Sequence, residues 1–166
     1  SEISVDKNNI RAVAVSSRPR NIDGSYMPCF LVGINSAVSV SKFSGAPLYK
    51  TSHQVGHILA GLYSIERLDL INEPLVAFHI SGGTTEALLV EPDNDEIITA
   101  KIIAQSSDLK AGQAIDRAGV MMGLPFPCGK ELDRLSLLSE KKYKIKPSMN
   151  GLDCSLSGVE NKAKKL

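Results

Sequence analysis

Two histidines, His53 and His57, stand four residues apart in the segment HQVGH. On a helix this spacing places both imidazole rings on one face, about one turn apart, where both can reach one ion. Neutral imidazole is a preferred ligand for Zn and Fe. Histidine pairs also occur at this spacing without function, but the chain has only three histidines, and these two follow a predicted strand directly. We therefore predict that His53 and His57 supply two ligands of a metal site.

A zinc peptidase is an alternative interpretation of this pair. In peptidases of the HExxH type, a glutamate beside the first histidine acts as the general base. Gln54 occupies that position, and its carboxamide cannot accept a proton in that role. The local sequence therefore argues against hydrolysis of this type. A third ligand is also missing nearby, since Glu66 and Asp69 are candidates only if the helix ends and turns back.

A second polar segment, Ser81-Gly82-Gly83-Thr84-Thr85, joins two apolar runs. Its glycines allow positive φ and a close approach of backbone N–H groups to an anion, and its hydroxyls add donors. A plain hairpin turn is the better interpretation of this segment taken alone. The chain contains neither the Walker GxxxxGK[ST] motif nor the Rossmann GxGxxG motif, so the common nucleotide-binding folds are not indicated.

Two further features could contact a nucleoside. Asp116 lies in a helix that Gly112 helps to open, and its carboxylate could accept hydrogen bonds from ribose hydroxyls. In isolation, a solvated charge on a helix is the better interpretation of Asp116. The segment GLPFPCG, residues 123–129, predicts a rigid turn that ends one helix and could pack on a base. His79 lies on a predicted strand and is expected to be a core or edge residue.

The elements that position these residues follow from the hydrophobic pattern. Apolar runs at 11–16 and 47–50 predict strands, and helices are predicted after them at about 27–43 and 54–65. Thr51 or Ser52 can cap the second helix. The order strand, helix, strand, helix is typical of parallel pairing through crossover connections.

The second half of the chain begins after a break at 72–74. Apolar runs at 75–80, 86–91 and 96–103 predict a three-stranded antiparallel meander. The remaining elements are predicted as helices at about 110–122 and 129–139, a linker at 140–150, a strand at 152–156 and a helix from 157.

The composition fits a folded protein, with 43% apolar and 22% charged residues. A net charge of +1 excludes a general electrostatic attraction to nucleic acid, although the lysine runs at 141–144 and 162–165 could contact phosphates locally. Cys29, Cys128 and Cys154 are widely spaced and odd in number, which favours reduced thiols in a cytoplasmic protein. No apolar run approaches the ~18 residues of a membrane span, so no membrane partner is expected.

In their order, these segments resemble those of the TsaD/Gcp family, the tRNA threonylcarbamoyladenosine synthases once called O-sialoglycoprotein endopeptidases or glycoproteases. The matching segments are HQVGH, FHISGGTT, DLKAGQAID, GLPFPCG and DCSLSG. They follow the family's HxxGH, SGGHT, DDAAGEAFDK, GLPYPGG and FSFSGLK segments at closely similar spacing. The resemblance covers essentially the whole chain.

The resemblance implies an α/β fold, part of a two-lobed actin-like ATPase (ribonuclease H-like) fold with mixed sheets flanked by helices. Residues 1–70 would be the remainder of the first lobe with the metal-site helix. Residues 71–166 would begin the second lobe with the phosphate turn and the nucleoside-contacting helices. The implied reaction moves a threonylcarbamoyl group from its adenylate to N6 of adenosine 37 in tRNA, with accessory protein subunits as partners.

The resemblance also assigns site residues. His53 and His57 would bind Zn or Fe, and Asp116 and Gly129 would contact the nucleoside. The phosphate of ATP or of threonylcarbamoyl-adenylate would be bound by Ser81, Gly82, Gly83 and Thr84.

Several positions depart from the family pattern. Arg18-Pro19-Arg20 replaces a Gly-Pro-Gly loop, Thr84 replaces a histidine, and Gln113 replaces a glutamate. These departures favour a divergent paralogue, and they leave a metallopeptidase or a non-catalytic nucleotide-binding paralogue as alternatives. The family's third metal ligand would lie beyond Leu166, so we expect a fragment that is inactive by itself.

Overall fold

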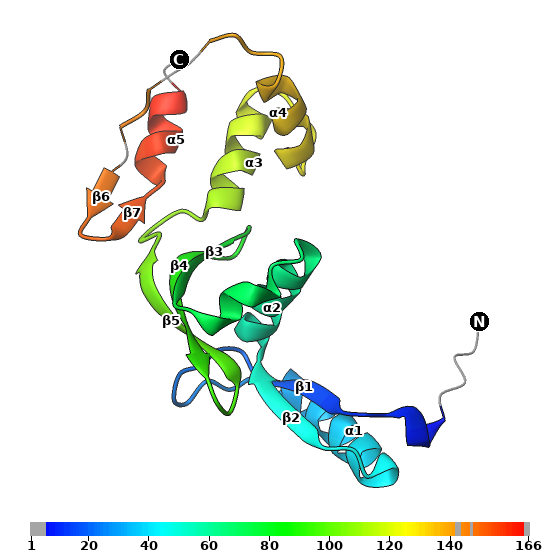
Figure 1. The fold of residues 1–166 in the computed structure, drawn as a ribbon. Helices are drawn as coiled ribbons and strands as arrows, with labels where there is room; N and C mark the ends of the chain where they lie inside the picture. Colours follow the sequence, from blue (N-terminus) through cyan, green and yellow to red (C-terminus); the bar gives the residue numbers. More distant parts are fainter. Residues whose placement is uncertain (1–5, 142–143, 147, 165–166) are drawn as a thin grey trace. The chain divides into compact units, whose positions relative to one another are not determined.

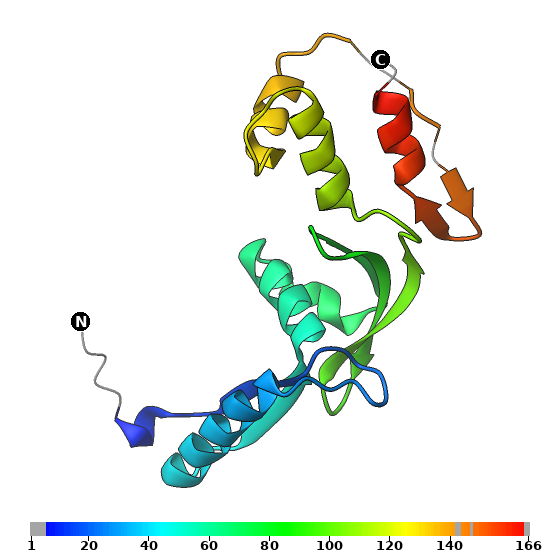
Figure 2. The same ribbon diagram turned by 180° about the vertical axis from the view of Figure 1, so that it is seen from behind.

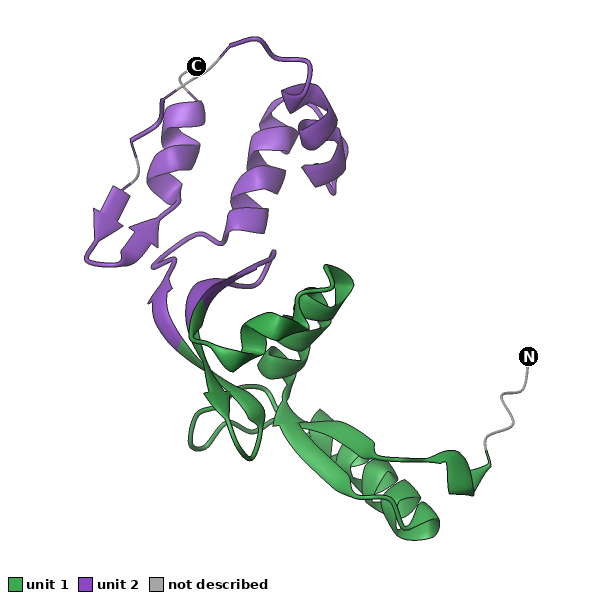
Figure 3. Cartoon of the chain, viewed as in Figure 1, with its two compact units in different colours: residues 1–75, 89–101 green, residues 76–88, 102–166 purple. Residues whose placement is uncertain are grey.

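The computed structural model describes residues 6–141, 144–146 and 148–164. They form a mixed α/β fold that divides into two compact units (Figure 3). The first unit comprises residues 1–75 and 89–101, and the second comprises residues 76–88 and 102–166. The division into lobes at residues 70 and 71 stays a prediction.

The first unit is built on two parallel strands. β1 (Val13–Arg18) pairs in parallel with β2 (Leu48–Ser52). The crossover helix α1 (Cys29–Ser44) lies along this pair, and α2 (His53–Ser64) begins where β2 ends (Figures 1 and 2). The predicted order of elements and the parallel pairing are confirmed. Two short 3-10 helices complete this part, at Lys7–Asn9 and Leu68–Asn72.

A three-stranded sheet follows along the chain. It consists of β3 (Leu75–Ile80), β4 (Thr85–Asp93) and β5 (Ile97–Gln105), in the order β3-β4-β5 of the predicted meander. Burial alternates along β4 and along the first half of β5, as expected for strands with one covered face. The fully or nearly fully buried residues of these two strands include Leu88, Val90, Ile98 and Ala100.

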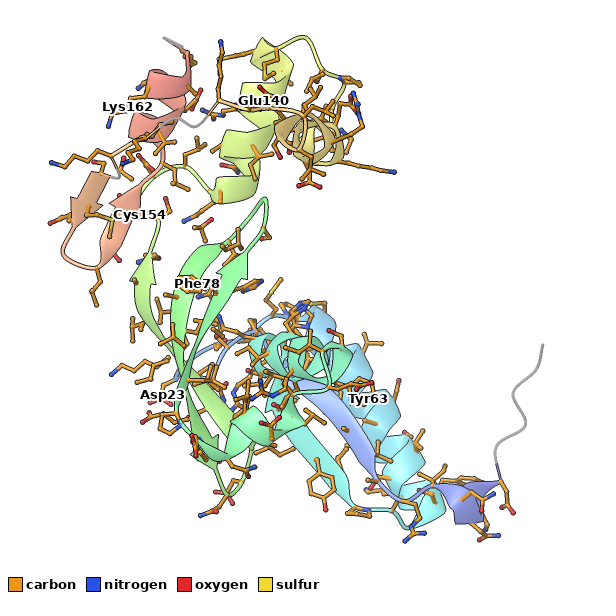
Figure 4. The ribbon with its side chains drawn as sticks, turned by 45° about the horizontal axis from the view of Figure 1, so that its top comes forward. Asp23, Tyr63, Phe78, Glu140, Cys154 and Lys162 are labelled. Carbon is orange, nitrogen blue, oxygen red and sulfur yellow. The ribbon has the colours of Figure 1, made fainter. Side chains whose placement is uncertain are left out.

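The outer side of β3 carries apolar side chains that the described residues leave exposed. Phe78 is 73% exposed, and its side chain projects from β3 in Figure 4. Val76 and Ile80 share its exposure, while Leu75, Ala77 and His79 are partly covered. β3 is therefore an edge strand with one apolar exposed face.

After β5, the described residues of the second unit form three α-helices and a small hairpin. α3 (Ala111–Met121) packs against α4 (Gly129–Ser136) and α5 (Ser157–Ala163) (Figure 1). The two strands of the hairpin are β6 (Ser148–Asn150) and β7 (Asp153–Ser155), paired antiparallel.

The predicted linker at 140–150 is wrong at its C-terminal end. Residues 148–150 form β6, because Gly151 adopts φ 61° and lets the chain reverse onto β7. Residues 142, 143 and 147 of that linker lie outside the described residues.

Cys29, Cys128 and Cys154 are free in the structure. None of the helices in the described ranges has the length and apolar character that crossing a membrane requires.

Candidate functional site

The histidine pair sits at the start of α2, in the first unit. Ser52 caps this helix, because its Oγ accepts the backbone N–H of Val55 at 3.1 Å. The cap places His53 in the first turn and His57 one turn later, and their Nε2 atoms are 3.0 Å apart. Two nitrogens bound to one tetrahedral Zn, each about 2.0–2.1 Å from it, would lie about 3.3 Å apart. The exposed imidazoles thus already converge to nearly the separation that a shared metal ion requires.

A third ligand is not found among the residues that the structure describes. They contain no group of three or more His, Cys, Asp or Glu side chains that could hold a metal ion. Asp69 accepts hydrogen bonds from Nε and Nη2 of Arg67, and this hydrogen bonding lowers the pKa of Asp69. Neither Glu66 nor Asp69 therefore completes the histidine site.

The loop after β1 is tied to the beginning of α2. Asn21 accepts a hydrogen bond from the Oγ of Ser52 at 2.8 Å and donates one to Oε2 of Glu96 at 2.7 Å. Glu96 also forms an ion pair with Arg18. Ser52 is fully buried, so this chain of contacts anchors the helix that carries the histidines. The departure from the family pattern at Arg18 therefore has a structural role in this chain.

The predicted phosphate turn lies in the second unit, and the side chain of its own Ser81 already binds two of its backbone N–H groups. The Oγ of Ser81 accepts the N–H groups of Gly83 at 3.2 Å and Thr84 at 3.0 Å. Gly82 and Gly83 do not adopt positive φ, and a Cβ at either would meet nothing within 4 Å. The freedom of these glycines to adopt positive φ is therefore not used in this turn. An anion that takes the two amides would have to displace the hydroxyl of Ser81.

The glycine that the turn requires is Gly112, at the start of α3. Its N–H donates to the carbonyl of Ser81 at 3.1 Å, and the N–H of Ala111 donates to Oγ1 of Thr85 at 2.8 Å. A Cβ at Gly112 would lie 2.7 Å from the backbone nitrogen of Gly82. The turn and the first turn of α3 are thus in direct backbone contact, which only glycine permits.

Asp116 and Gly82 line one cavity of about 730 Å³ in the second unit. Oδ1 of Asp116 accepts the N–H of Cys128 at 2.8 Å, whereas Oδ2 accepts no hydrogen bond from the described residues. The other lining residues are Gln113, Arg117, Val120, Met121, Phe126, Glu160 and Lys164.

The predicted nucleotide residues are only partly brought together. The lining of this cavity does not include Ser81, Gly83, Thr84 or Gly129, all of which the structure describes. Gly129 begins α4, where the nearest atom to an added Cβ would be Cγ2 of Ile115 at 3.9 Å. Contacts of these residues with a nucleotide stay predictions.

Sequence reasoning missed a charged group on the cavity wall. Glu160 of α5 is 8% exposed, and its Oε1 pairs with Nζ of Lys164 at 2.9 Å while its Oε2 pairs with Nη1 of Arg117 at 3.4 Å. The hydrogen bond from Lys164, together with both positive charges, lowers the pKa of Glu160. The i,i+4 spacing of Glu160 and Lys164 is visible in the sequence, but the contact with Arg117 on α3 is not.

Asp108 holds the two helices of the cavity wall together. Its carboxylate accepts hydrogen bonds from Oγ of Ser155 at 2.6 Å, from the N–H of Leu156 at 2.9 Å and from Oγ of Ser157. These bonds, that of Ser155 first, hold the pKa of Asp108 well below its usual range. Asp108 lies three residues before α3, and its partners are the two residues before α5 and Ser157, the first residue of α5, so the carboxylate joins the segments in which both helices start.

The three separate sheets, β1-β2, β3-β4-β5 and β6-β7, together with the helices between them, form an α/β chain that is consistent with part of an actin-like, ribonuclease H-like fold. The predicted fold class is thereby confirmed. The family model TsaD, described as tRNA N6-adenosine threonylcarbamoyltransferase, matches residues 1–166. The chain belongs to the TsaD family, as its ordered motifs predicted.

Individual relatives agree with this assignment. The chain is similar to the tRNA N6-adenosine threonylcarbamoyltransferases of Streptococcus pneumoniae strains CGSP14 and JJA, with 31% identity over 163 residues in both cases. Each match covers 96% of this chain and 45% of the relative. The chain thus spans a little under half the length of these relatives.

Proposed function

We propose that this chain takes part in the transfer of a threonylcarbamoyl group from its adenylate to N6 of adenosine 37 in tRNA. The observation that supports this best is the cavity of about 730 Å³ that Gly82 and Asp116 line together. Small-molecule sites are usually clefts of about 300–1,000 Å³ with an apolar lining and a few placed polar groups. This cavity has both kinds of lining and is large enough for an adenylate.

The residues of the cavity suggest a role for each part of a nucleotide. Oδ2 of Asp116 is available to accept hydrogen bonds from ribose hydroxyls. Val120, Met121 and Phe126 supply an apolar wall, and Phe126 is 75% exposed, so its ring is accessible to a base. Gly82 adds a surface without a side chain, which permits close approach of a ligand.

The proposed metal site consists of His53 and His57. A Zn or Fe ion bound there would act as a Lewis acid that polarises a carbonyl oxygen of the acyl group. The chain's own contribution is to hold two Nε2 atoms 3.0 Å apart on a capped helix. At least one further ligand must come from outside the described residues. tRNA, accessory protein subunits and a cytoplasmic location belong to the same proposal.

A metallopeptidase has less support. Gln54 is 4% exposed, and its backbone N–H donates to the carbonyl of Pro19 at 3.1 Å. A buried carboxamide cannot serve as the general base beside His53. Gln54, which occupies the position of the general base in such peptidases, is therefore both chemically unsuited to that role and buried.

The decisive experiment supplies the protein expressed from its complete gene with threonylcarbamoyl-adenylate and unmodified tRNA. Modified adenosine in the digested tRNA, detected by mass spectrometry, is the expected result. Asp116→Ala should lower the rate, while Asp95→Asn, at an exposed turn of the first unit, should leave it unchanged. Nucleotide binding without product would instead favour a non-catalytic paralogue, and cleavage of a glycoprotein substrate would favour a peptidase.

A further inference from the structure

The wall of the nucleotide cavity carries two cations that share one buried carboxylate. Arg117 lies on α3, and Lys164 lies at the C-terminal end of α5. Both line the cavity, and their side chains are 60% and 45% exposed, whereas that of Glu160 between them is 8% exposed. Glu160 thus lies beneath two accessible positive groups.

The charge balance of this cluster, Arg117, Glu160 and Lys164, leaves one positive charge. One carboxylate cannot neutralise two cations, and most of their N–H groups stay available, because a guanidinium has five and an ammonium has three. Glu160 engages Arg117 only through Nη1 and Lys164 only through Nζ. The cluster therefore orients both cations while leaving them able to bind a further anion.

The glycine turn is the weaker candidate for that anion. Ser81 already accepts the N–H groups of Gly83 and Thr84, so two of the turn's amides have an internal partner. Within the described part of the chain, Arg117 and Lys164 are the basic residues that line the cavity. Charged donors bind phosphate about twice as strongly as neutral N–H groups do.

We propose that Arg117 and Lys164 form a phosphoryl-binding subsite of this cavity, held in place by Glu160. This inference rests on the proposed binding of an adenylate in the same cavity. Asp116, one residue before Arg117 on α3, carries a negative charge that repels anions, so it suits the uncharged ribose. The subsite binds the phosphate of the nucleotide whose nucleoside contacts Asp116.

The test compares two ligands that differ only in phosphate. Adenosine and AMP are titrated by calorimetry into the intact wild-type protein and into the double variant Arg117→Gln/Lys164→Gln. We expect the variant to bind AMP at least ~10-fold more weakly, the usual effect of losing a charge-assisted hydrogen bond, and to bind adenosine as the wild type does. The single variant Arg117→Lys keeps both positive charges of the subsite and should therefore retain most of the wild-type AMP affinity.

A matched control and a folding check accompany this comparison. Arg134→Gln removes an exposed arginine of α4 that pairs with Glu131 and does not line the cavity, so its AMP affinity should equal the wild-type value. The double variant leaves Glu160 without its partners, so the triple variant with Glu160→Gln is measured beside it, and thermal unfolding confirms that each protein is folded.

The outcomes separate the two proposals. If adenosine binds but AMP affinity is unchanged in the double and triple variants, the phosphoryl subsite is wrong and nucleoside binding stands. An equal loss of adenosine and AMP affinity in a folded variant also overturns the subsite, because the effect is then not on phosphate. If the wild type binds neither ligand, the proposed nucleotide function fails, and the subsite fails with it.

Discussion

The contact between Gly112 and the turn gives the sharpest prediction on the architecture of the second unit. In Gly112→Ala the new methyl carbon would lie 2.7 Å from the nitrogen and 2.8 Å from the Cα of Gly82, and 2.9 Å from the carbonyl carbon of Ser81. All three are backbone atoms, so no side-chain rotation relieves the overlap. Carbon contacts are favourable near ~3.5–4.0 Å, so the turn must move by roughly 1 Å.

That displacement has a calculable cost. Overpacking of this kind typically destabilises a protein by about 1–3 kcal/mol, and alanine recovers up to about 1 kcal/mol through its helix propensity. The movement also lengthens the hydrogen bonds from Gly112 to Ser81 and from Ala111 to Thr85. We therefore expect Gly112→Ala to lower the free energy of unfolding by about 1–2 kcal/mol. It should also weaken AMP binding, because Gly82 lines the cavity.

Gly83→Ala is the matched control, with the same chemical change in the turn itself. A Cβ at Gly83 meets nothing within 4 Å, and its φ is not positive, so stability should change by less than about 0.5 kcal/mol. Urea denaturation followed by far-UV circular dichroism measures both variants. If Gly112→Ala is as stable as the wild type, or Gly83→Ala loses as much as Gly112→Ala, the close backbone contact is not what holds the turn.

Four further variants test other parts of the chain. His53→Ala and His57→Ala should each abolish stoichiometric Zn or Fe in the intact protein, measured by elemental analysis, and unchanged metal content would refute the ligand assignment. Ser52→Ala removes a helix cap and a buried side-chain hydrogen bond, so the denaturation midpoint should report a loss of about 1–2 kcal/mol. The pKa of Asp108 is lowered by hydrogen bonds, that of Ser155 first, so its stabilising effect is present above the ordinary carboxyl pKa of ~3.9 and is lost as pH falls below it. Asp108→Asn should therefore lower the melting temperature near neutral pH and reduce its decline on acidification; an unchanged acid profile would exclude this role.

The local features of the site could be predicted because they depend on spacing along one element. The rings of His53 and His57 meet because residues four apart share a helix face, and Ser52, the last residue of β2, caps that helix because it directly precedes it. The alternating burial of β4 likewise follows from a period of two. In each case the residues that determine the feature lie within a few positions of one another in the sequence.

The features that escaped prediction join distant segments. Arg117 and Glu160 are 43 residues apart, and Asp108 lies 47 residues from Ser155, so no periodicity relates them. Gly82 could adopt positive φ but does not, and its turn is instead closed by the hydroxyl of Ser81. A short polar side chain can replace a special backbone conformation, and residue types alone do not distinguish the two solutions.

The presence of a glycine at a position is an unreliable guide to ligand contact in this chain. At Gly119 an added Cβ would lie 2.2 Å from the Cβ of Cys128, and at Gly112 it would meet the backbone of the turn. Both glycines are required by packing between segments of the second unit. Gly82 and Gly83, in contrast, face open space and are not required by their own backbone. A glycine that the fold does not need is the better candidate for approach by a ligand, which favours Gly82 at the edge of the cavity over Gly112 beside it.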